Sequence, residues 1–348
     1  MQLLKSILDQ YLEREYFSGA VCTVIKDDDL VFEQSLGYTN INQSQKVTSE
    51  TVFDLASLTK IVTSTLILRL ITNQKLSLKT QLGDCLPIQQ KELSSITIHQ
   101  LLTHSSGIKA WHPFYTHLPE RNFFKLLDDI EIKHDGREKV EYSDLNYMLL
   151  GKVLEHEYST DLNQIVNQNL NKRLSSDFSY GPLNASNIAA TEFGNRTEMG
   201  MCKNRGLDFN QWRQTDQPII GEVNDGNTYY FFNGQAGHAG LFGSVKDLIK
   251  LNDLYLKGGV YNHEVFLNEE LINQSLENQV GQRGLGWHSG RPFPAGMGHT
   301  GFTGTAIWIV PEHQLNVVLL TNRLNTKQPQ NLQGFREEVF KAIMDEFI

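Results

Sequence analysis

The chain has 348 residues, 40% of them hydrophobic and 20% charged, a composition typical of a folded globular protein. Its formal net charge is −9 and its basic residues are scattered, so we expect no nucleic-acid partner. No apolar run approaches the roughly 20 residues that span a bilayer, so we expect no membrane span. The first residues do not resemble a signal peptide, and the three cysteines (Cys22, Cys85 and Cys202) are far apart, which together predict a cytoplasmic protein with reduced thiols.

The first part of the chain predicts a helix, a hairpin and a second helix. Apolar residues between positions 3 and 12 recur at helical spacing, as in an amphipathic helix. The segment GAVCTVIKDDDLVFEQSLG (19–37) contains two β-rich runs around an acidic turn, which predicts a hairpin. From Ser57 to about Ile71 apolar residues occupy nearly every side, as in a helix buried all round.

The remaining segments predict the architecture. Residues 74–234 read as helices and loops with few strands, whereas residues 297–323 read as strands joined by tight turns and 332–347 as a final helix. We therefore expect an α+β fold, an α/β sandwich whose antiparallel sheet is flanked by the N- and C-terminal helices. Residues 1–73 and 235–348 are expected to form this sheet domain, with an all-helical domain, 74–234, inserted into it.

Ser57 and Lys60 form an SxxK pair at the start of the buried helix. Residues three apart lie on nearly the same helical face, and a helix amino terminus favours an oxyanion. Burial would lower the pKa of Lys60, and a neutral lysine can activate a serine as a base. In the alternative reading, Ser57 is a helix cap followed by an ordinary lysine. Ser106 and Lys109 also match SxxK, but Gly107 is expected to end the helix there.

Two later motifs favour the catalytic reading. Tyr142-Ser143-Asp144 stands at the start of a predicted helix, and His299-Thr300-Gly301 precedes the closing strands. With Ser57-x-x-Lys60 and the turn LLTHSSGI (101–108), the sequence resembles the serine β-lactamase and penicillin-binding protein superfamily, specifically the class C β-lactamase-like serine hydrolases. The resemblance covers nearly the whole chain and implies a β-lactamase/DD-peptidase-like fold.

The resemblance also implies a role for each motif. Ser57 would attack a carbonyl, Lys60 would help to activate it, and Tyr142 would act with Lys60 as base and then as acid toward the leaving group. The backbone N–H groups of Ser57 and Phe302 would form the oxyanion hole, and His299-Thr300-Gly301 would border the acyl site. The expected substrate is a small acyl compound, no metal or cofactor is expected, and the sequence carries no signal for an oligomeric state.

Two positions depart from the family pattern. Asp144 stands where much of the family has asparagine, so it either faces Lys60 and raises the pKa of that amine, or turns away and caps its helix. His299 replaces the usual lysine of the third motif and is expected to be mostly neutral. Both changes predict a less cationic site that holds anionic substrates less well.

Three functions follow from this interpretation. The leading one is a serine hydrolase that acts through an acyl-enzyme, most simply an esterase on small acyl esters. The second is a peptidase on D-amino-acid or cell-wall-derived peptides, or a weak β-lactamase. The third is a catalytically idle relative that serves as a binding protein, which the coexistence of Ser57, Lys60 and Tyr142 disfavours.

Two further stretches receive structural interpretations. His238, between glycines in AGHAGLF, is expected near the cleft as a hydrogen-bonded part of its wall. The segment NDGN (224–227) is predicted to be a surface turn.

Overall fold

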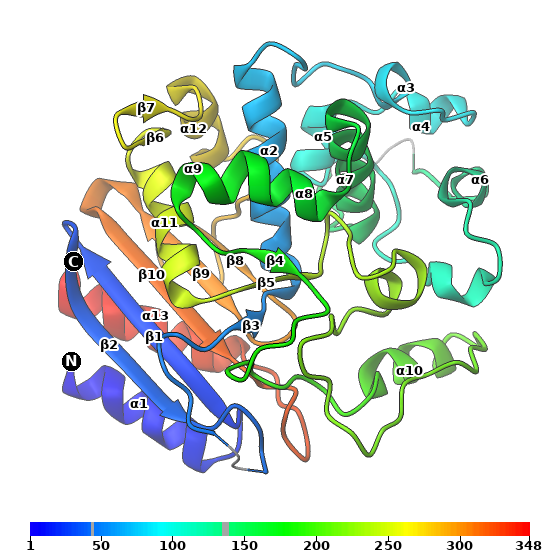
Figure 1. Cartoon of the computed structure of the whole chain (residues 1–348). Helices are drawn as coiled ribbons and strands as arrows, with labels where there is room; N and C mark the ends of the chain where they lie inside the picture. The colour runs from blue at the N-terminus through cyan, green and yellow to red at the C-terminus, as the bar shows by residue number, and fades with distance from the viewer. Residues whose placement is uncertain (43–44, 134–138) are drawn as a thin grey trace.

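The computed structural model describes residues 1–42, 45–133 and 139–348. A five-stranded antiparallel sheet with the order β2-β1-β10-β9-β8 brings the two ends of the chain together (Figure 1). Its strands are β1 (Gly19–Lys26), β2 (Asp29–Gly37), β8 (Met297–Thr300), β9 (Ala306–Val310) and β10 (Leu315–Thr321). The predicted hairpin is β1-β2, and the predicted closing strands are β8 to β10.

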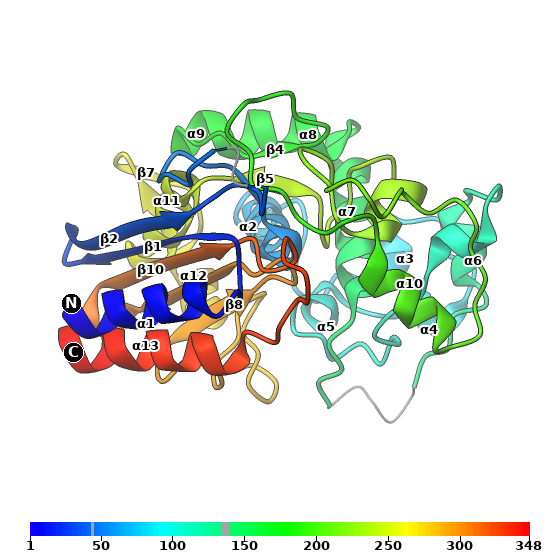
Figure 2. The same cartoon turned by 90° about the horizontal axis from the view of Figure 1, so that it is seen from below.

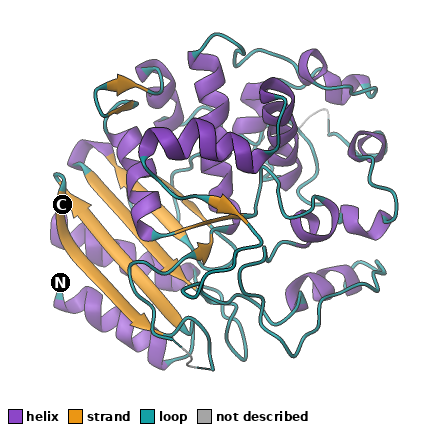
Figure 3. Ribbon diagram, viewed as in Figure 1, coloured by secondary structure: helices purple, strands orange, loops and turns teal. Residues whose placement is uncertain are grey.

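The sheet separates two hydrophobic cores because its buried strands carry apolar residues on both faces. In β9, Trp308 faces the core under α1 (Gln2–Glu13) and α13 (Gln333–Phe347), while Ile307 and Ile309 face the opposite core. The terminal helices run side by side along one face of the sheet (Figure 2). The opposite face is covered by α11 (Val245–Leu256), and α2 (Thr59–Thr72) lies beyond it (Figures 1 and 3). The predicted α+β sandwich is confirmed.

Short helices and loops fill most of the middle of the chain. They are α3 (Leu82–Cys85), α4 (Lys91–Ser94), α5 (Ile98–Leu102), α6 (Phe123–Leu127), α7 (Asp144–Tyr158), α8 (Leu162–Val166), α9 (Lys172–Leu174) and α10 (Arg196–Lys203). A small sheet joins β4 (Ser179–Tyr180) to β5 (Leu241–Gly243) and β3 (Phe53–Asp54); the hairpin β6 (Val260–Tyr261)-β7 (Glu264–Val265) and α12 (Glu269–Leu276) follow α11. The predicted division into a 1–73/235–348 domain and a 74–234 domain stays a prediction.

Helix α2 lies at the centre of the molecule and presents its amino-terminal end beside the end of β8. Nearly all of its residues are buried, because apolar side chains surround its axis. None of the helices in the described parts of the chain is both long enough and apolar enough to cross a membrane.

Candidate active site

Ser57 lies in a 3₁₀ turn, η1 (Ala56–Leu58), that leads directly into α2. Ala56 has a φ of 46°, a left-handed conformation that is strained for a residue with a side chain. The carboxyl of Asp54 holds this turn, because its Oδ1 accepts a hydrogen bond from Ala56 N–H at 2.9 Å. The N-cap of α2 is Leu58, without a side-chain cap, so the reading of Ser57 as a helix cap is wrong.

Lys60 is fully buried, and three acceptors surround its Nζ. These are Ser57 Oγ at 2.9 Å, Asp144 Oδ1 at 2.8 Å and the backbone oxygen of His238 at 3.1 Å. An ammonium has three N–H donors, so the three contacts use its full capacity.

The pKa of Lys60 results from two opposed effects. Burial acts to lower it, but the charge and hydrogen bonding of Asp144, together with Tyr142, raise it above the ordinary value for lysine. Of the two directions considered for the pKa of Lys60, lowering by burial and raising by a facing Asp144, the structure favours the second. Lys60 is an ammonium at neutral pH, and it donates a hydrogen bond to Ser57.

Asp144 is the first residue of α7 and points toward Lys60 instead of capping the helix, whose N-cap is Ser143. Of the two orientations considered for Asp144, the structure has the one that faces the lysine. The carboxylate therefore compensates the buried charge of Lys60, which no apolar environment would tolerate alone.

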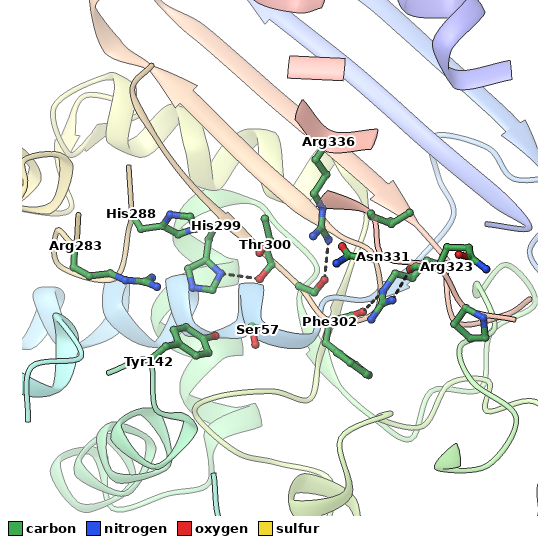
Figure 4. A pocket seen from close by; sticks show the side chains of 14 residues that line it. Ser57, Tyr142, Arg283, His288, His299, Thr300, Phe302, Arg323, Asn331 and Arg336 are labelled. Atoms are coloured by element: carbon green, nitrogen blue, oxygen red, sulfur yellow. Dashed lines mark hydrogen bonds between the residues drawn. The ribbon is translucent and has the colours of Figure 1, made fainter. Parts of the chain in front are cut away.

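Tyr142 directs its phenol toward Ser57 (Figure 4). Its ring lies over the ammonium of Lys60, with 5.1 Å between Nζ and the ring centroid. Behind it lies the ring of His104, from the turn LLTHSSGI, at a centroid distance of 4.5 Å. The Nδ1 of His104 accepts a hydrogen bond from Ser143 N–H at 3.1 Å, so this turn fixes the segment that carries Tyr142 and Asp144.

The third motif forms the end of β8 and the turn after it. His299 is buried, and burial lowers its pKa well below the ordinary value, so it is neutral as expected. After Thr300 and Gly301, Phe302 lies 41% exposed at the mouth of the cleft, and no acceptor for its backbone N–H is found among the described residues. The side chain of Thr303 ties this turn to Asp54 O at 2.8 Å, beside the turn of Ser57.

A cleft of about 640 Å³ opens from Ser57 along the third motif. Arg283, Arg323 and Arg336 line it together with His288 and His299, and no carboxylate of the described residues does so (Figure 4). The cleft therefore carries positive charge from outside the three motifs, and the predicted loss of positive charge through Asp144 and His299 stays a prediction. Single motif positions could not reveal this, because the arginines come from the loop before β8, the loop after β10 and helix α13.

A smaller cavity of about 210 Å³ lies on the other side of Ser57 and Tyr142, and its wall includes Trp111, Asp144, Glu198, Asp225 and His238. His238 Nε2 lies 3.0 Å from Asp225 Oδ1, so His238 is part of the wall, as expected. The prediction of a surface turn at 224–227 is wrong, because Asn224 and Asn227 are buried. Asparagine and glycine suit an exposed turn and a buried turn equally well. Only the tertiary contacts distinguish one from the other.

The structure thus brings together all the residues predicted for the site: Ser57, Lys60, Tyr142, Asp144, His299, Thr300, Gly301 and Phe302. Ser106 and Lys109 do not meet in this way, since Ser106 Oγ donates to Asn146 and Lys109 Nζ contacts His112. The sequence analysis missed Asp54, Glu198 and Arg283, none of which belongs to a recognisable spacing. His104 lies in the recognised turn LLTHSSGI, but no role was predicted for it.

Comparison with known proteins agrees with this arrangement. The model of the family described as Beta-lactamase matches residues 4–338. The chain is similar to the N-acetylmuramyl-L-alanine amidase of Bacillus subtilis (28% identical, covering 92% of this chain and 81% of the relative) and to a putative D-alanyl-D-alanine carboxypeptidase of Escherichia coli (28% identical, covering 86% and 77%).

Solved structures of the same fold include two close matches in shape. The octameric penicillin-binding protein homologue from Pyrococcus abyssi has a TM-score of 0.75 at 20% identity, over 98% of this chain and 76% of that one. The class C β-lactamase from Rhodobacter sphaeroides has a TM-score of 0.71 at 19% identity, over 99% and 100%. The match of the family model over nearly the whole chain, together with the shared fold, shows that this protein belongs to the β-lactamase family of serine hydrolases.

Proposed function

We propose that the chain is a serine amidase that cleaves short peptide-type substrates through an acyl-enzyme on Ser57. The observation that carries this is the buried ammonium of Lys60, which contacts both Ser57 and Asp144 while the phenol of Tyr142 points at the same serine. The names of the two curated relatives, an amidase and a carboxypeptidase, support an amide as the scissile bond.

In this mechanism Tyr142 acts as a phenolate, formed when its phenol releases a proton to solvent, and it accepts the proton of Ser57 to become a phenol again. Lys60 cannot accept that proton while charged, but its ammonium, with Nζ 5.1 Å from the ring centroid of Tyr142, stabilises the phenolate. Ser57 Oγ then bonds to the carbonyl carbon, and the N–H groups of Ser57 and Phe302 stabilise the oxyanion. Tyr142 returns the proton to the leaving nitrogen as the C–N bond breaks, and water releases the acyl group by the reverse sequence of proton transfers.

Arg283 supports a leaving group that carries a carboxylate. Its guanidinium lies 5.2 Å from the ring centroid of Tyr142, and its Nη1 is buried without a hydrogen-bond partner in the described part of the chain. When Tyr142 protonates the leaving amine, a carboxylate on the same leaving group would lie within reach of the Arg283 guanidinium. An amino acid released from a peptide end has such a carboxylate.

An esterase is the second candidate, and Asp144 favours it. With its Oδ1 bound to Lys60, this carboxylate offers no N–H donor to an amide of the substrate. If the chain is an esterase, it should cleave a chromogenic ester much faster than nitrocefin or an amide substrate.

The test begins with the nucleophile. A fluorophosphonate probe should label Ser57, as located by mass spectrometry, and Ser57→Ala should abolish labelling and reduce turnover by roughly 10⁴-fold or more. The cleavage rates of three kinds of substrate then show which bond type is preferred. They are N-acetylmuramyl-L-alanine, D-alanyl-D-alanine peptides and a 4-nitrophenyl ester. Labelling that survives in Ser57→Ala would remove the mechanism.

A further inference from the structure

The smaller cavity beside Ser57 has one acidic side chain without a compensating charge. Asp144 is paired with Lys60, and Asp225 contacts His238 and accepts hydrogen bonds from Thr228. Glu198, from α10, has no cationic partner within ion-pair distance among the described residues. Its carboxyl accepts hydrogen bonds only from neutral groups there, namely Asn195 Nδ2, at 3.3 Å from Oε2, and the backbone N–H of Gly226.

The position of Glu198 is built into the fold. It is only 7% exposed, yet it lines the cavity, so the part of its side chain that remains accessible faces that space. A Cβ on Gly226 would lie 2.2 Å from Glu198 Oε2, so the glycine lets the backbone approach the carboxyl closely. The surrounding structure thus holds this carboxyl by hydrogen bonds from Asn195 and Gly226, and no cation among the described residues pairs with it.

Without a cation beside it, Glu198 favours its protonated form. Burial most strongly, and then the nearby carboxyl of Asp225, raise its pKa well above the ordinary value, and an ammonium bound beside it would take the place of that proton. Arg213 acts in the opposite sense, but its guanidinium is already bonded to Asn195 Oδ1 and to the backbone oxygens of residues 223 and 224. Among the described residues, no lysine or arginine lines the cavity.

We propose that the smaller cavity is a subsite for the free amino group of the substrate, which Glu198 binds as an ammonium. This rests on the proposed amidase function and narrows its substrate class to aminoacyl compounds with an unblocked amine. A cavity of about 210 Å³ accommodates little more than one amino-acid residue, so the amine lies close to the scissile carbonyl. With Arg283 on the opposite side of Ser57, the site then fits a zwitterion of dipeptide size.

The test compares two amides that differ only in the amine: alanyl-4-nitroanilide and its N-acetyl derivative, each as the D and L forms. Wild type should cleave the free-amine form of its preferred enantiomer with a kcat/KM about 10–100-fold higher, the range expected for a hydrogen-bonded charge. The preference should decline above about pH 8, where the α-amine loses its proton. Because this pH series uses the wild-type protein, it does not depend on the folding of any variant.

Two variants locate the effect. Glu198→Gln should bring the ratio of the two kcat/KM values close to one, whereas Glu222→Gln, which removes a more exposed carboxylate from a nearby loop, should keep the wild-type ratio. Fluorophosphonate labelling of Ser57 in each variant verifies an intact nucleophile. Labelled wild-type protein that cleaves the N-acetyl amide as fast as the free amine would overturn the subsite alone. Failure to label Ser57 would overturn the proposed function.

Discussion

Lys60 Nζ lies 2.8 Å from Asp144 Oδ1, and the ammonium is entirely buried while the carboxylate is 23% exposed. The pair reverses the effect that burial alone would have on the lysine, since it keeps the amine charged. In the proposed mechanism, the aspartate at position 144 therefore sets the roles in the site: the ammonium of Lys60 stabilises the phenolate of Tyr142, and Tyr142 transfers the proton.

Asp144→Asn should make Lys60 easier to deprotonate. Without the carboxylate, desolvation dominates and the pKa of Lys60 falls below the ordinary value. The folded variant then binds fewer protons than its unfolded chain, so its stability rises with pH up to the ordinary lysine range. The loss of stability, about 3–5 kcal/mol at pH 7, should become smaller toward pH 10, as measured by urea unfolding.

The surface pair of Lys125 and Glu120 offers a matched control for that experiment. Glu120→Gln should show little cost and no such pH trend, because exposed ion pairs contribute little. In the rate profile of Asp144→Asn, the alkaline limb should move to lower pH as Lys60 loses its proton. If the alkaline decline of the rate stays at the same pH as in the wild type, the proposed role of the Lys60 ammonium in catalysis is contradicted.

Tyr142→Phe should remove the proton carrier and leave the fold intact. We expect kcat to fall by roughly 10²–10⁴-fold, the range of general acid–base catalysis, with a parallel loss of fluorophosphonate labelling. The control is Tyr147→Phe, because the ring centroid of Tyr147 also lies close to Lys60, 5.8 Å from its Nζ. The hydroxyl of Tyr147, however, is hydrogen-bonded to Ser64 and to Leu102 O. That variant should lose stability and keep most of its activity. Equal rates for Tyr142→Phe and wild type would exclude the phenol as the base.

Much of the fold and the centre of the site follow from local sequence patterns. The buried helix after Ser57, the hairpin at 19–37 and the terminal helices depend on periodicity, which short-range sequence carries. Arg283 and Glu198 have no such signal. Each is an isolated charged residue in a polar segment, and its role becomes visible only when the fold places it in a cavity that Ser57 also lines, without an ion-pair partner among the described residues. The pKa of Lys60 was unpredictable for a related reason, since its direction depended on the orientation of Asp144.

Arg283→Gln should weaken substrates that carry a carboxylate on the leaving group. The guanidinium has no acceptor of its own among the described residues, so a substrate carboxylate gains a charged hydrogen bond there. For a peptide with a free carboxyl end, kcat/KM should fall by about 10–100-fold, and the same peptide with a carboxamide end should be much less affected. Arg283→Lys should retain part of the preference for the free carboxyl end.

Arg291→Gln, at an exposed arginine paired with Glu337, controls for the change in net charge. A wild-type enzyme indifferent to the two peptide ends would exclude this role.

Asp54→Ala should loosen the turn that holds Ser57. The buried carboxyl accepts hydrogen bonds from Ala56 N–H at 2.9 Å and from Asn224 N–H at 2.7 Å, so its loss leaves two buried donors unpaired and frees a residue in a strained conformation. We expect the free energy of unfolding to fall by about 2–4 kcal/mol, together with a large loss of kcat.

Burial raises the pKa of Asp54 to about 6, above its unfolded value of 3.8, so the folded wild type binds the proton more tightly than the unfolded chain does. Wild type should therefore gain about 1 kcal/mol relative to Asp54→Ala between pH 7 and pH 5, as measured by urea unfolding. Asp216→Ala, at an exposed position, should show no such change, and a pH-independent difference for Asp54→Ala would mean that this carboxyl titrates as it does in the unfolded chain.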